Sequence, residues 1–189
     1  MNPYPERFLD LLELLLVQQG DNHVAIDLGA GGRVPPHGVL GMEFVHTPNN
    51  HVQGDVMSLP FGDGTVDLIL SQAVLEHVTN PDLAVQEMRR ILKPGGVLYV
   101  EIAFMQPLHM DPWHYFNVTP RGLTWLLRDW DVDEQGTLGS FEDMVEWLYR
   151  EAGVKRSPHQ KVQDKRARPP AVLYERVAYG VYATARKPV

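Results

Sequence analysis

One stretch of the sequence decides the fold, namely Ala25-Ile26-Asp27-Leu28-Gly29-Ala30-Gly31-Gly32. It reads as a buried strand that ends at an acidic residue and runs into a glycine-rich turn, where missing Cβ atoms let a ligand approach the backbone. A dinucleotide-binding G-x-G-x-x-G motif starting at Gly29 would need glycine at position 34, which is Val34. The turn therefore indicates a loop for an uncharged or cationic cofactor, with Asp27 placed to orient a cationic group. An ordinary turn with incidental glycines is the alternative.

The composition fits a single globular domain over residues 1–189. The chain has no cysteine, which excludes disulfides and cysteine nucleophiles and fits a cytoplasmic protein. Its formal net charge is -7, and an acidic chain is a poor partner for the phosphate backbones of nucleic acids. The basic cluster at residues 155–168 reads as a solvated loop, and the apolar run at residues 8–17 is too short to cross a membrane.

Apolar runs alternate with turn signals along the first half of the chain. An amphipathic helix is expected within residues 1–22, and a second helix at 81–92, which Pro94-Gly95-Gly96 would end. Five strands are expected, at residues 24–28, 38–44, 52–55, 66–71 and 97–104. Strands that alternate with helices indicate an open α/β fold with a parallel sheet.

The second half of the chain has a different pattern. Residues 105–120 are rich in histidine, proline and aromatic residues and are expected to form a loop over the edge of the sheet. Thr119 is expected to cap a short helix that ends at residue 128, and Ser140 a longer helix that ends near residue 152. Further strands are expected at 130–138 and 177–186, with a mobile basic loop at 154–171 before the last strand.

Four segments then occur in a characteristic order, at residues 27–31 (DLGAG), 54–61 (GDVMSLPF), 67–77 (DLILSQAVLEH) and 90–96 (RILKPGG). Together they resemble the class I S-adenosylmethionine-dependent methyltransferases, in the broad group that acts mostly on small molecules. The resemblance covers roughly residues 24–104 and implies S-adenosylmethionine as the cofactor. It also implies an open, Rossmann-like sheet of seven mostly parallel strands, with the last strand antiparallel and helices on both faces.

The resemblance further implies a cofactor site beyond the carboxyl ends of the strands. The glycine turn would pass under the methionine part, Glu43 would accept hydrogen bonds from the ribose hydroxyls, and Asp55 would accept one from the adenine amino group. Val56 would offer its backbone amide to the adenine ring. Asp55 as a turn residue and Glu43 as a solvated strand end are the alternatives. The implied cofactor residues are Asp27, Gly29, Ala30, Gly31, Glu43, Asp55, Val56 and Gln72.

The sequence departs from the family's pattern just after the glycine turn. Arg33 stands where the family has a third glycine. Only residues 32–37 separate the first two expected strands, where the family has a full helix, and Pro35-Pro36 cannot form one. The shortened connection keeps open a second reading, in which the chain is a non-catalytic binding or regulatory protein with the methyltransferase fold.

The loop at 105–120 carries the candidate catalytic groups, which are His109, Asp111 and His114. A histidine could take the proton of an alcohol or amine acceptor near neutral pH, and Asp111 could orient it. A structural lid whose residues bond one another is the alternative, and a core or helix-cap role is slightly favoured for His77. A metal site on the three candidate groups is not expected, because they are crowded into one short loop. The candidate acceptor-binding residues are His77, Trp113, Tyr115 and Phe116.

The sequence therefore predicts methyl transfer to a small-molecule acceptor. The loop has a weaker resemblance to methyltransferases of sugar or polysaccharide biosynthesis, which favours a sugar or another biosynthetic intermediate. An NAD-dependent oxidoreductase is disfavoured by Val34 and by the absence of a Tyr-x-x-x-Lys pair. No nucleic acid or membrane partner is expected. A homodimer stays open, since the first helix could cover its own sheet or a neighbour's.

Overall fold

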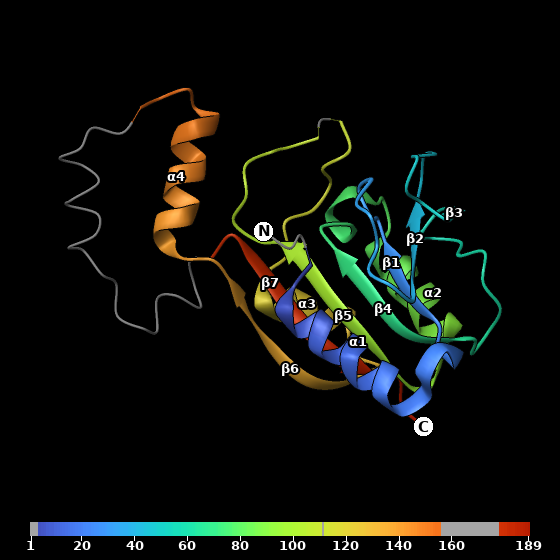
Figure 1. Cartoon of the computed structure of the whole chain (residues 1–189). Helices are drawn as coiled ribbons and strands as arrows, with labels where there is room; N and C mark the ends of the chain where they lie inside the picture. Colours follow the sequence, from blue (N-terminus) through green and yellow to red (C-terminus); the bar gives the residue numbers. More distant parts are fainter. Residues whose placement is uncertain (1–3, 111, 156–177) are drawn as a thin grey trace.

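The computed structural model describes residues 4–110, 112–155 and 178–189, which form one seven-stranded sheet with helices around it (Figure 1). The strands are β1 (Ala25–Leu28), β2 (Val39–Glu43), β3 (Val52–Gln53), β4 (Val66–Gln72), β5 (Leu92–Ala103), β6 (Asp131–Leu138) and β7 (Gly180–Arg186). The helices are α1 (Glu6–Gln19), α2 (Pro81–Ile91), α3 (Pro120–Leu126) and α4 (Phe141–Glu151), with short 3-10 helices η1 (Gly20–Asn22) and η2 (Leu75–His77).

The sheet has the strand order β3-β2-β1-β4-β5-β7-β6. The strands from β3 to β5 run parallel, and β7 runs antiparallel to both of its neighbours. At the centre, Ile26 of β1 lies opposite Leu40 of β2 and Ile69 of β4. The carboxyl ends of β1, β2, β4 and β5 therefore meet at one edge of the sheet. This arrangement confirms the predicted open, mostly parallel fold.

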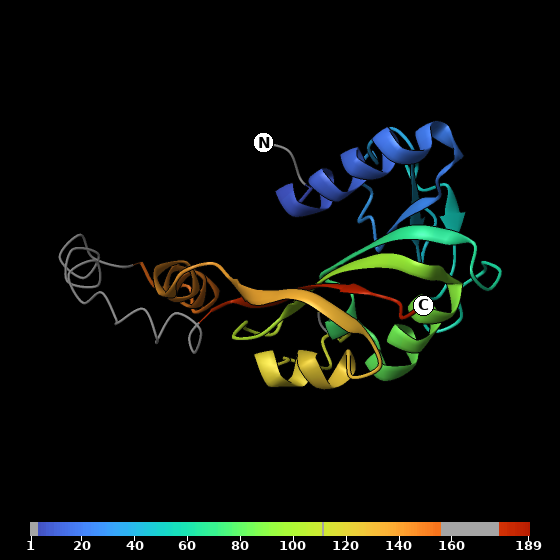
Figure 2. The same ribbon diagram turned by 90° about the horizontal axis from the view of Figure 1, so that it is seen from below.

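Helices cover both faces of the sheet, as predicted (Figure 2). On one face, Phe8 and Leu12 of α1 pack against Leu68 and Leu70 of β4. On the other face, α2 and α3 cover the larger part of the core. Burying each Leu, Ile or Phe side chain contributes roughly 1.5–3 kcal/mol, so the two apolar layers hold the parallel strands together. The fully buried residues of this second layer include Ile26, Ile69, Met88, Ile91, Leu98 and Leu123.

A proline loop connects β1 and β2, where the family has a helix, as Pro35-Pro36 predicted. Pro36 accepts a hydrogen bond at its carbonyl from the backbone N–H of Val39, at 3.1 Å. Pro35 lies so close to β2 that a Cβ atom on Gly41 would come within 2.9 Å of its Cγ. The shortened connection therefore packs directly on β2, and glycine at position 41 makes this contact possible.

Strand β5 begins earlier than predicted, at Leu92 rather than at residue 97. Its first residue pairs with Val66, and the register against β4 then shifts before Leu68. Gly95 inside this stretch has a φ of +76°, which favours glycine. Pro94-Gly95-Gly96 thus marks an irregularity within the strand, because pairing with β4 resumes on its far side.

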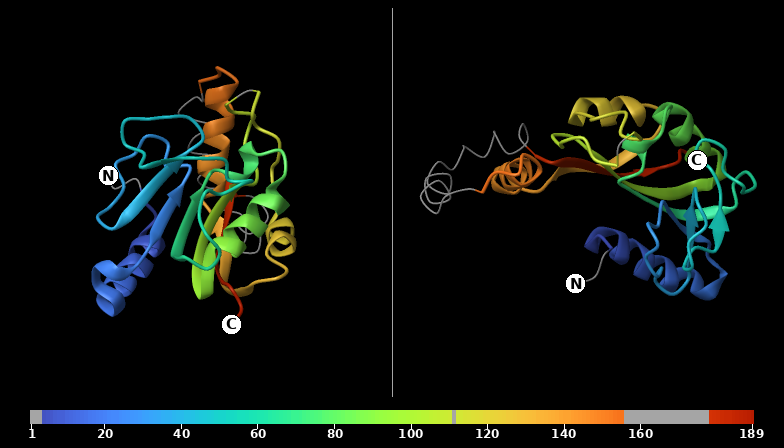
Figure 3. Two further views of the ribbon diagram at one scale, coloured as in Figure 1. Left: turned by 90° about the vertical axis from the view of Figure 1, so that its right-hand side faces the viewer. Right: turned by 90° about the horizontal axis from the view of Figure 1, so that it is seen from above.

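The two later helices begin as their capping residues predicted. The Oγ1 atom of Thr119 accepts a hydrogen bond from the N–H of Gly122 at 3.0 Å, at the start of α3. Ser140 and Asp143 form a reciprocal capping box at the start of α4. Figure 3 shows that α4 stands beyond the ends of β6 and β7, apart from the main layers.

Some predictions fall outside the described residues. These include most of the basic loop at 154–171, the start of the last strand at 177, and Asp111. The single-domain assignment over residues 1–189 also stays a prediction. Among the helices that the structure describes, none combines the length and the apolar character needed to cross a bilayer.

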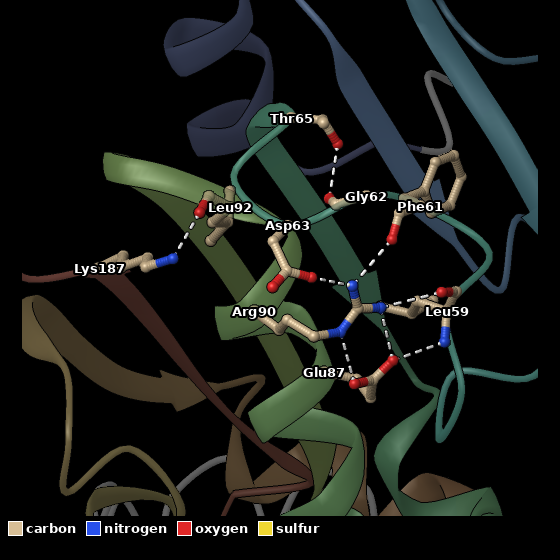
Figure 4. A network of polar contacts seen from close by, with 9 residues as sticks. All are labelled: Leu59, Phe61, Gly62, Asp63, Thr65, Glu87, Arg90, Leu92 and Lys187. Atoms are coloured by element: carbon tan, nitrogen blue, oxygen red, sulfur yellow. Dashed lines mark hydrogen bonds and ion pairs between the residues drawn. The ribbon is translucent and has the colours of Figure 1, made fainter.

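One arginine ties the connection between β3 and β4 to helix α2 (Figure 4). The guanidinium of Arg90 donates hydrogen bonds to the carbonyl oxygens of Leu59 and Phe61, at 3.0 and 2.9 Å. It also pairs with the carboxylates of Asp63 and Glu87, each at 2.7 Å. The Glu87 carboxylate in turn accepts from the N–H of Leu59 at 2.8 Å. This network fixes a connection that has neither helix nor strand of its own.

Replacing Arg90 with methionine is expected to lower the free energy of unfolding by about 1–2 kcal/mol, because two carbonyls and two carboxylates lose a charged donor. The side chain is 32% exposed, so water replaces part of what is lost. Chemical denaturation measures the change. The matched control Arg121→Met, at an exposed position on α3, is expected to stay within about 0.5 kcal/mol of wild type. Equal losses for both variants would contradict the role given to the network.

Candidate cofactor and acceptor site

The glycine turn lies at the carboxyl edge of the sheet, directly after β1. The N–H groups of Gly29 and Ala30 both donate to the carbonyl of Met42 in β2, at 2.9 and 3.2 Å. Gly29 has a φ of +71°, and a Cβ atom there would lie 2.4 Å from the Cγ2 of Val74. Glycine is therefore required at position 29 by both conformation and space.

Glu43 ends β2 beside this turn. Its Oε1 atom accepts a hydrogen bond from the backbone N–H of Gly31. Asn49 supports the same turn from the other side, because its amide donates to the carbonyl of Gly32 at 2.7 Å. The Glu43 carboxylate is half-buried and has a second oxygen, so it can hold the turn and also accept from a ligand hydroxyl.

Asp27 is fully buried and lies at the centre of a polar cluster at the end of β1. The Arg33 guanidinium donates to both carboxylate oxygens of Asp27, at 3.0 and 3.1 Å, and the Tyr4 hydroxyl donates to Oδ2 at 2.9 Å. The Tyr4 ring also faces the guanidinium, with 4.8 Å between the ring centroid and Cζ. The cationic group that Asp27 orients in this structure is thus Arg33, the residue that replaces the family's third glycine.

Burial dominates the electrostatics of this cluster. It raises the pKa of Asp27 to about 6, against the opposing effects of the Arg33 cation and the Tyr4 hydrogen bond, while the Glu43 charge adds to the rise. The pKa of Tyr4 is also raised, first by burial and then by the Asp27 charge. Asp27 is held as a carboxylate at neutral pH only because it has close, well-directed partners.

Gln72 extends the cluster from β1 to β5. Its Oε1 atom accepts from Arg33, and its Nε2 donates to Glu101 of β5 at 2.9 Å. The Tyr99 hydroxyl donates to the other oxygen of Glu101 at 2.8 Å. A continuous chain of hydrogen bonds therefore crosses the ends of β1, β4 and β5, and Gln72 is held at its centre by partners on both sides.

Asp55 lies in a turn just after β3. Its Oδ1 accepts from the N–H of Met57 at 2.8 Å, and its carbonyl accepts from the N–H of Ser58 at 2.9 Å. Asp55 is therefore a turn residue, which was the alternative given in the sequence analysis. This turn occupies one of its two carboxylate oxygens. The Val56 side chain is buried in the core layer that includes residues of α2, so it anchors the turn. The cofactor-binding roles that the resemblance implies for Asp55 and Val56 stay predictions.

The loop between β5 and α3 is hydrogen-bonded to η2, the short helix that follows β4. The N–H groups of Tyr115 and Phe116 both donate to the carbonyl of Glu76, at 2.8 and 3.4 Å. The Nδ1 atom of His77 donates to the carbonyl of Trp113 at 2.8 Å. These contacts bring the loop over the carboxyl edge, and they leave the aromatic rings of Trp113, Tyr115 and Phe116 exposed.

Three histidine rings gather where this loop meets η2. The ring centroids of His77 and His109 are 4.9 Å apart, and those of His109 and His114 are 4.2 Å apart. Burial is the largest cause that lowers the pKa of His77, and the neighbouring histidines add to it. The adjacent Glu76 is fully buried, and burial raises its pKa to about 7 against the backbone N–H groups near it. Burial therefore disfavours the charged forms of both Glu76 and His77.

The described cavities lie elsewhere. One of about 380 Å³ lies between α2 and α3, beside Arg128. Another of about 510 Å³ lies beneath α1, near Lys93 where β5 begins. Neither cavity is lined by the glycine turn or the histidine cluster. The candidate site at the carboxyl edge is therefore identified by its polar residues and not by a cavity.

The structure brings together two groups of the predicted residues, one around the glycine turn and one around the histidines. Sequence reasoning missed four side chains that belong to them. Glu101 follows Tyr99 by two positions on a strand, which places both on one face. No local sequence signal indicates the long-range partners of Tyr4 or Arg33. Glu76 directly precedes the predicted site residue His77 in the sequence. The missed residues are Tyr4, Arg33, Glu76 and Glu101.

Comparison with known sequences supports this geometry. Residues 13–100 match the family described as methyltransferase domain. The ubiquinone/menaquinone biosynthesis C-methyltransferase UbiE of Shewanella pealeana is 30% identical over 124 residues, covering 61% of this chain and 49% of that protein. The protein of the same name from Pasteurella multocida is 38% identical over 78 residues, covering 38% of this chain and 28% of that protein. The chain thus spans half or less of the length of these relatives.

Comparison with solved structures supports the fold. The phosphoethanolamine N-methyltransferase 2 of Haemonchus contortus, solved in complex with S-adenosyl-L-methionine, has a TM-score of 0.57 at 15% identity, covering 96% of this chain and 53% of that chain. The [4+2]-cyclase SpnF has a TM-score of 0.56 at 20% identity, covering 95% of this chain and 80% of that chain. The resemblance to the class I methyltransferases that the sequence motifs indicated is confirmed.

Proposed function

We propose that this chain, whose fold and sequence are those of a class I S-adenosylmethionine-dependent methyltransferase, transfers a methyl group from S-adenosylmethionine to a small-molecule acceptor. The observation that carries the proposal is the glycine turn after β1, with Glu43 and Gln72 at its sides, at the edge where open α/β sheets bind ligands. The matching methyltransferase family and the names of the curated relatives support it.

The residues at this edge fit the parts of the cofactor. The turn from Gly29 to Gly31 gives the backbone room beside the methionine part. The carboxylate of Glu43 suits the two ribose hydroxyls, because its oxygens accept hydrogen bonds and each hydroxyl can donate one. We expect Asp55 and the backbone N–H of Val56 to form hydrogen bonds with the adenine. Gln72, held by its hydrogen bond to Glu101, would face the cofactor and the acceptor.

The loop at 105–118 would hold the acceptor. The exposed rings of Trp113, Tyr115 and Phe116 offer apolar walls to a ring-shaped molecule, which suits a sugar or a phenolic biosynthetic intermediate. When bound, the cofactor supplies a methyl group already activated on a sulfonium. The chain has to hold the acceptor close and in line. A hydroxyl acceptor must also lose its proton, and the imidazoles of His77 and His109 lie where they can assist.

The proposal is tested by incubating the full chain with S-adenosylmethionine and a panel of hydroxylated sugars, phenols and quinols, and measuring S-adenosylhomocysteine by mass spectrometry. We expect one acceptor class to raise its formation well above the rate without acceptor. The Glu43→Ala variant should lose that increase. Cofactor binding with no turnover on any acceptor class would contradict the enzymatic proposal.

A second candidate function follows from Arg33. Its guanidinium fills the space beside Asp27 and Gln72, next to the position where the methionine part of the cofactor would lie. Such an arrangement suits a binding or regulatory protein that keeps the fold without methyl transfer. The acceptor panel separates the two candidates, because only the enzyme releases S-adenosylhomocysteine.

A further inference from the structure

Two histidines and a glutamate converge where η2 meets the loop after β5. Glu76 and His77 belong to η2, and His109 lies in the loop. One potential ligand atom of each, a carboxylate oxygen or a ring nitrogen, lies within 4.8 Å of the other two. The three residues come from two segments that are far apart in the sequence, and the hydrogen bonds between Glu76 and the loop hold these segments together.

Hydrogen bonds fix the same tautomer in both histidines. The Nδ1 atom of His77 lies 2.8 Å from the carbonyl of Trp113, and the Nδ1 atom of His109 lies 3.1 Å from the carbonyl of Pro107. A carbonyl oxygen only accepts, so in the neutral imidazole each Nδ1 carries the proton and each Nε2 has the lone pair. Histidines that bind metals through one nitrogen commonly donate from the other to a backbone carbonyl in this way.

Glu76 supplies an independent observation that points to a cation. Its side chain is fully buried, and both carboxylate oxygens lack a hydrogen-bond partner of normal geometry among the described residues. Leaving a buried carboxyl group in this state costs free energy. A bound cation would remove that cost, since it satisfies the carboxylate oxygens and favours their charged form.

His114 has a different part in the cluster. Its Nδ1 accepts from the backbone N–H of His109 at 3.2 Å, and its Nε2 lies 3.2 Å from both the carbonyl of Phe116 and the Oδ1 of Asn117. Both ring nitrogens are therefore engaged, and no lone pair points to the other two rings. His114 holds the backbone of His109 in place and is not a ligand.

We propose that Glu76, His77 and His109 bind a divalent transition-metal ion such as Zn²⁺. Two imidazole nitrogens and one carboxylate suit such ions, and three protein ligands leave a coordination position open. In a tetrahedral zinc site the ligand atoms lie about 3.4 Å apart, so the three atoms, which lie within 4.8 Å of one another, would approach by at most about 1.4 Å on binding. The ligand set differs from the one weighed in the sequence, because Glu76 and His77 join His109 in place of Asp111 and His114.

The open position gives the ion a chemical role beside the proposed acceptor site. A hydroxyl group or water that binds the ion would have a lowered pKa and would give up its proton more readily. His77 and His109 would then act as ligands and not as proton acceptors themselves. The metal site itself does not depend on methyl transfer, since all three ligand atoms come from side chains of this chain.

The test uses Co²⁺ as a spectroscopic probe of the full chain, at pH 8. We expect one equivalent of Co²⁺ to produce visible absorption bands of a low-symmetry, low-coordinate site, which added Zn²⁺ abolishes. Glu76→Gln and His109→Ala should each weaken Co²⁺ binding by about 100-fold or more, beyond the 10–100-fold typical of losing a ligand's hydrogen-bond partner. His37→Gln, at an exposed position before β2 and far from the carboxyl edge, is the matched control and should bind as wild type.

Circular dichroism of each variant separates a lost site from a lost fold, and His109→Ala keeps the test decisive if Glu76→Gln does not fold. No bands in the wild type would overturn the proposal, as would equal Co²⁺ affinity in His109→Ala and His37→Gln. Calorimetry with S-adenosylmethionine on the same preparations distinguishes this failure from failure of the proposed function. Cobalt binding without cofactor binding would leave the metal site standing and reject the methyltransferase.

Discussion

Replacing Arg33 with methionine is expected to lower the free energy of unfolding by about 3 kcal/mol at pH 8. The substitution removes the guanidinium from Asp27, which is fully buried, and leaves its charge with the Tyr4 hydroxyl alone among the partners described here. Breaking a buried pair from one side is costly because the remaining charge has no compensation. Arg33 itself is 19% exposed, so the estimate lies at the lower end of the usual range. Urea denaturation of both proteins measures the difference.

The loss should depend on pH in a defined direction. The pKa of Asp27 is about 6 in the folded chain against an ordinary value of 3.8, so the folded state binds the proton more tightly than the unfolded state. Ionised Asp27 therefore costs stability progressively as the pH rises from about 4 to about 6. Without Arg33 the pKa of Asp27 rises further, and the loss of folding stability on ionising Asp27 becomes larger. The gap between wild type and Arg33→Met should be small at pH 5 and largest above pH 7.

The Asp27→Asn variant is the control for this effect, because it removes the titrating group. In that background, Arg33→Met should cost much less, and the cost should hardly change between pH 5 and 8. A gap between wild type and Arg33→Met that is constant over this range would contradict the account of the buried pair.

Replacing Glu43 with alanine is expected to weaken S-adenosylmethionine binding by about 10- to 100-fold. Hydrogen bonds to a charged group contribute about 1.5–3 kcal/mol each, and Glu43 both holds the N–H of Gly31 and faces the proposed ribose position. Isothermal titration calorimetry measures the affinity. Glu13→Ala, at an exposed position on α1, is the matched control and should bind as wild type. Affinity within threefold of wild type in Glu43→Ala would remove Glu43 from the cofactor site.

The elements of the core could be predicted because their signals are local. The apolar run from Val66 to Leu70 is buried throughout in β4, as a strand covered on both faces must be. Thr119 and Ser140 begin their helices because their side chains accept from N–H groups only three residues away. The resemblance to the family then implied one open, mostly parallel sheet of seven strands, which single segments cannot specify, and the strand order came from the structure.

The site could be predicted only in part, because its decisive contacts are long-range. The bond between Arg33 and Gln72 joins residues 39 positions apart, and the bond between Tyr4 and Asp27 joins residues 23 positions apart. No sequence signal marked Glu76 as a buried residue, since its burial depends on how the loop after β5 folds over η2. The early start of β5 at Leu92 was missed for the same reason, because pairing with Val66 decides it.

The most direct test of the central claim is a calorimetric titration of the wild-type chain with S-adenosylmethionine, run beside an identical titration with NAD. The account predicts micromolar, one-to-one binding of S-adenosylmethionine and no measurable binding of NAD, since Val34 stands where a pyrophosphate-binding turn needs glycine. Absence of heat with S-adenosylmethionine, or tighter binding of NAD, would contradict the assignment of the glycine turn as a methyl-donor site.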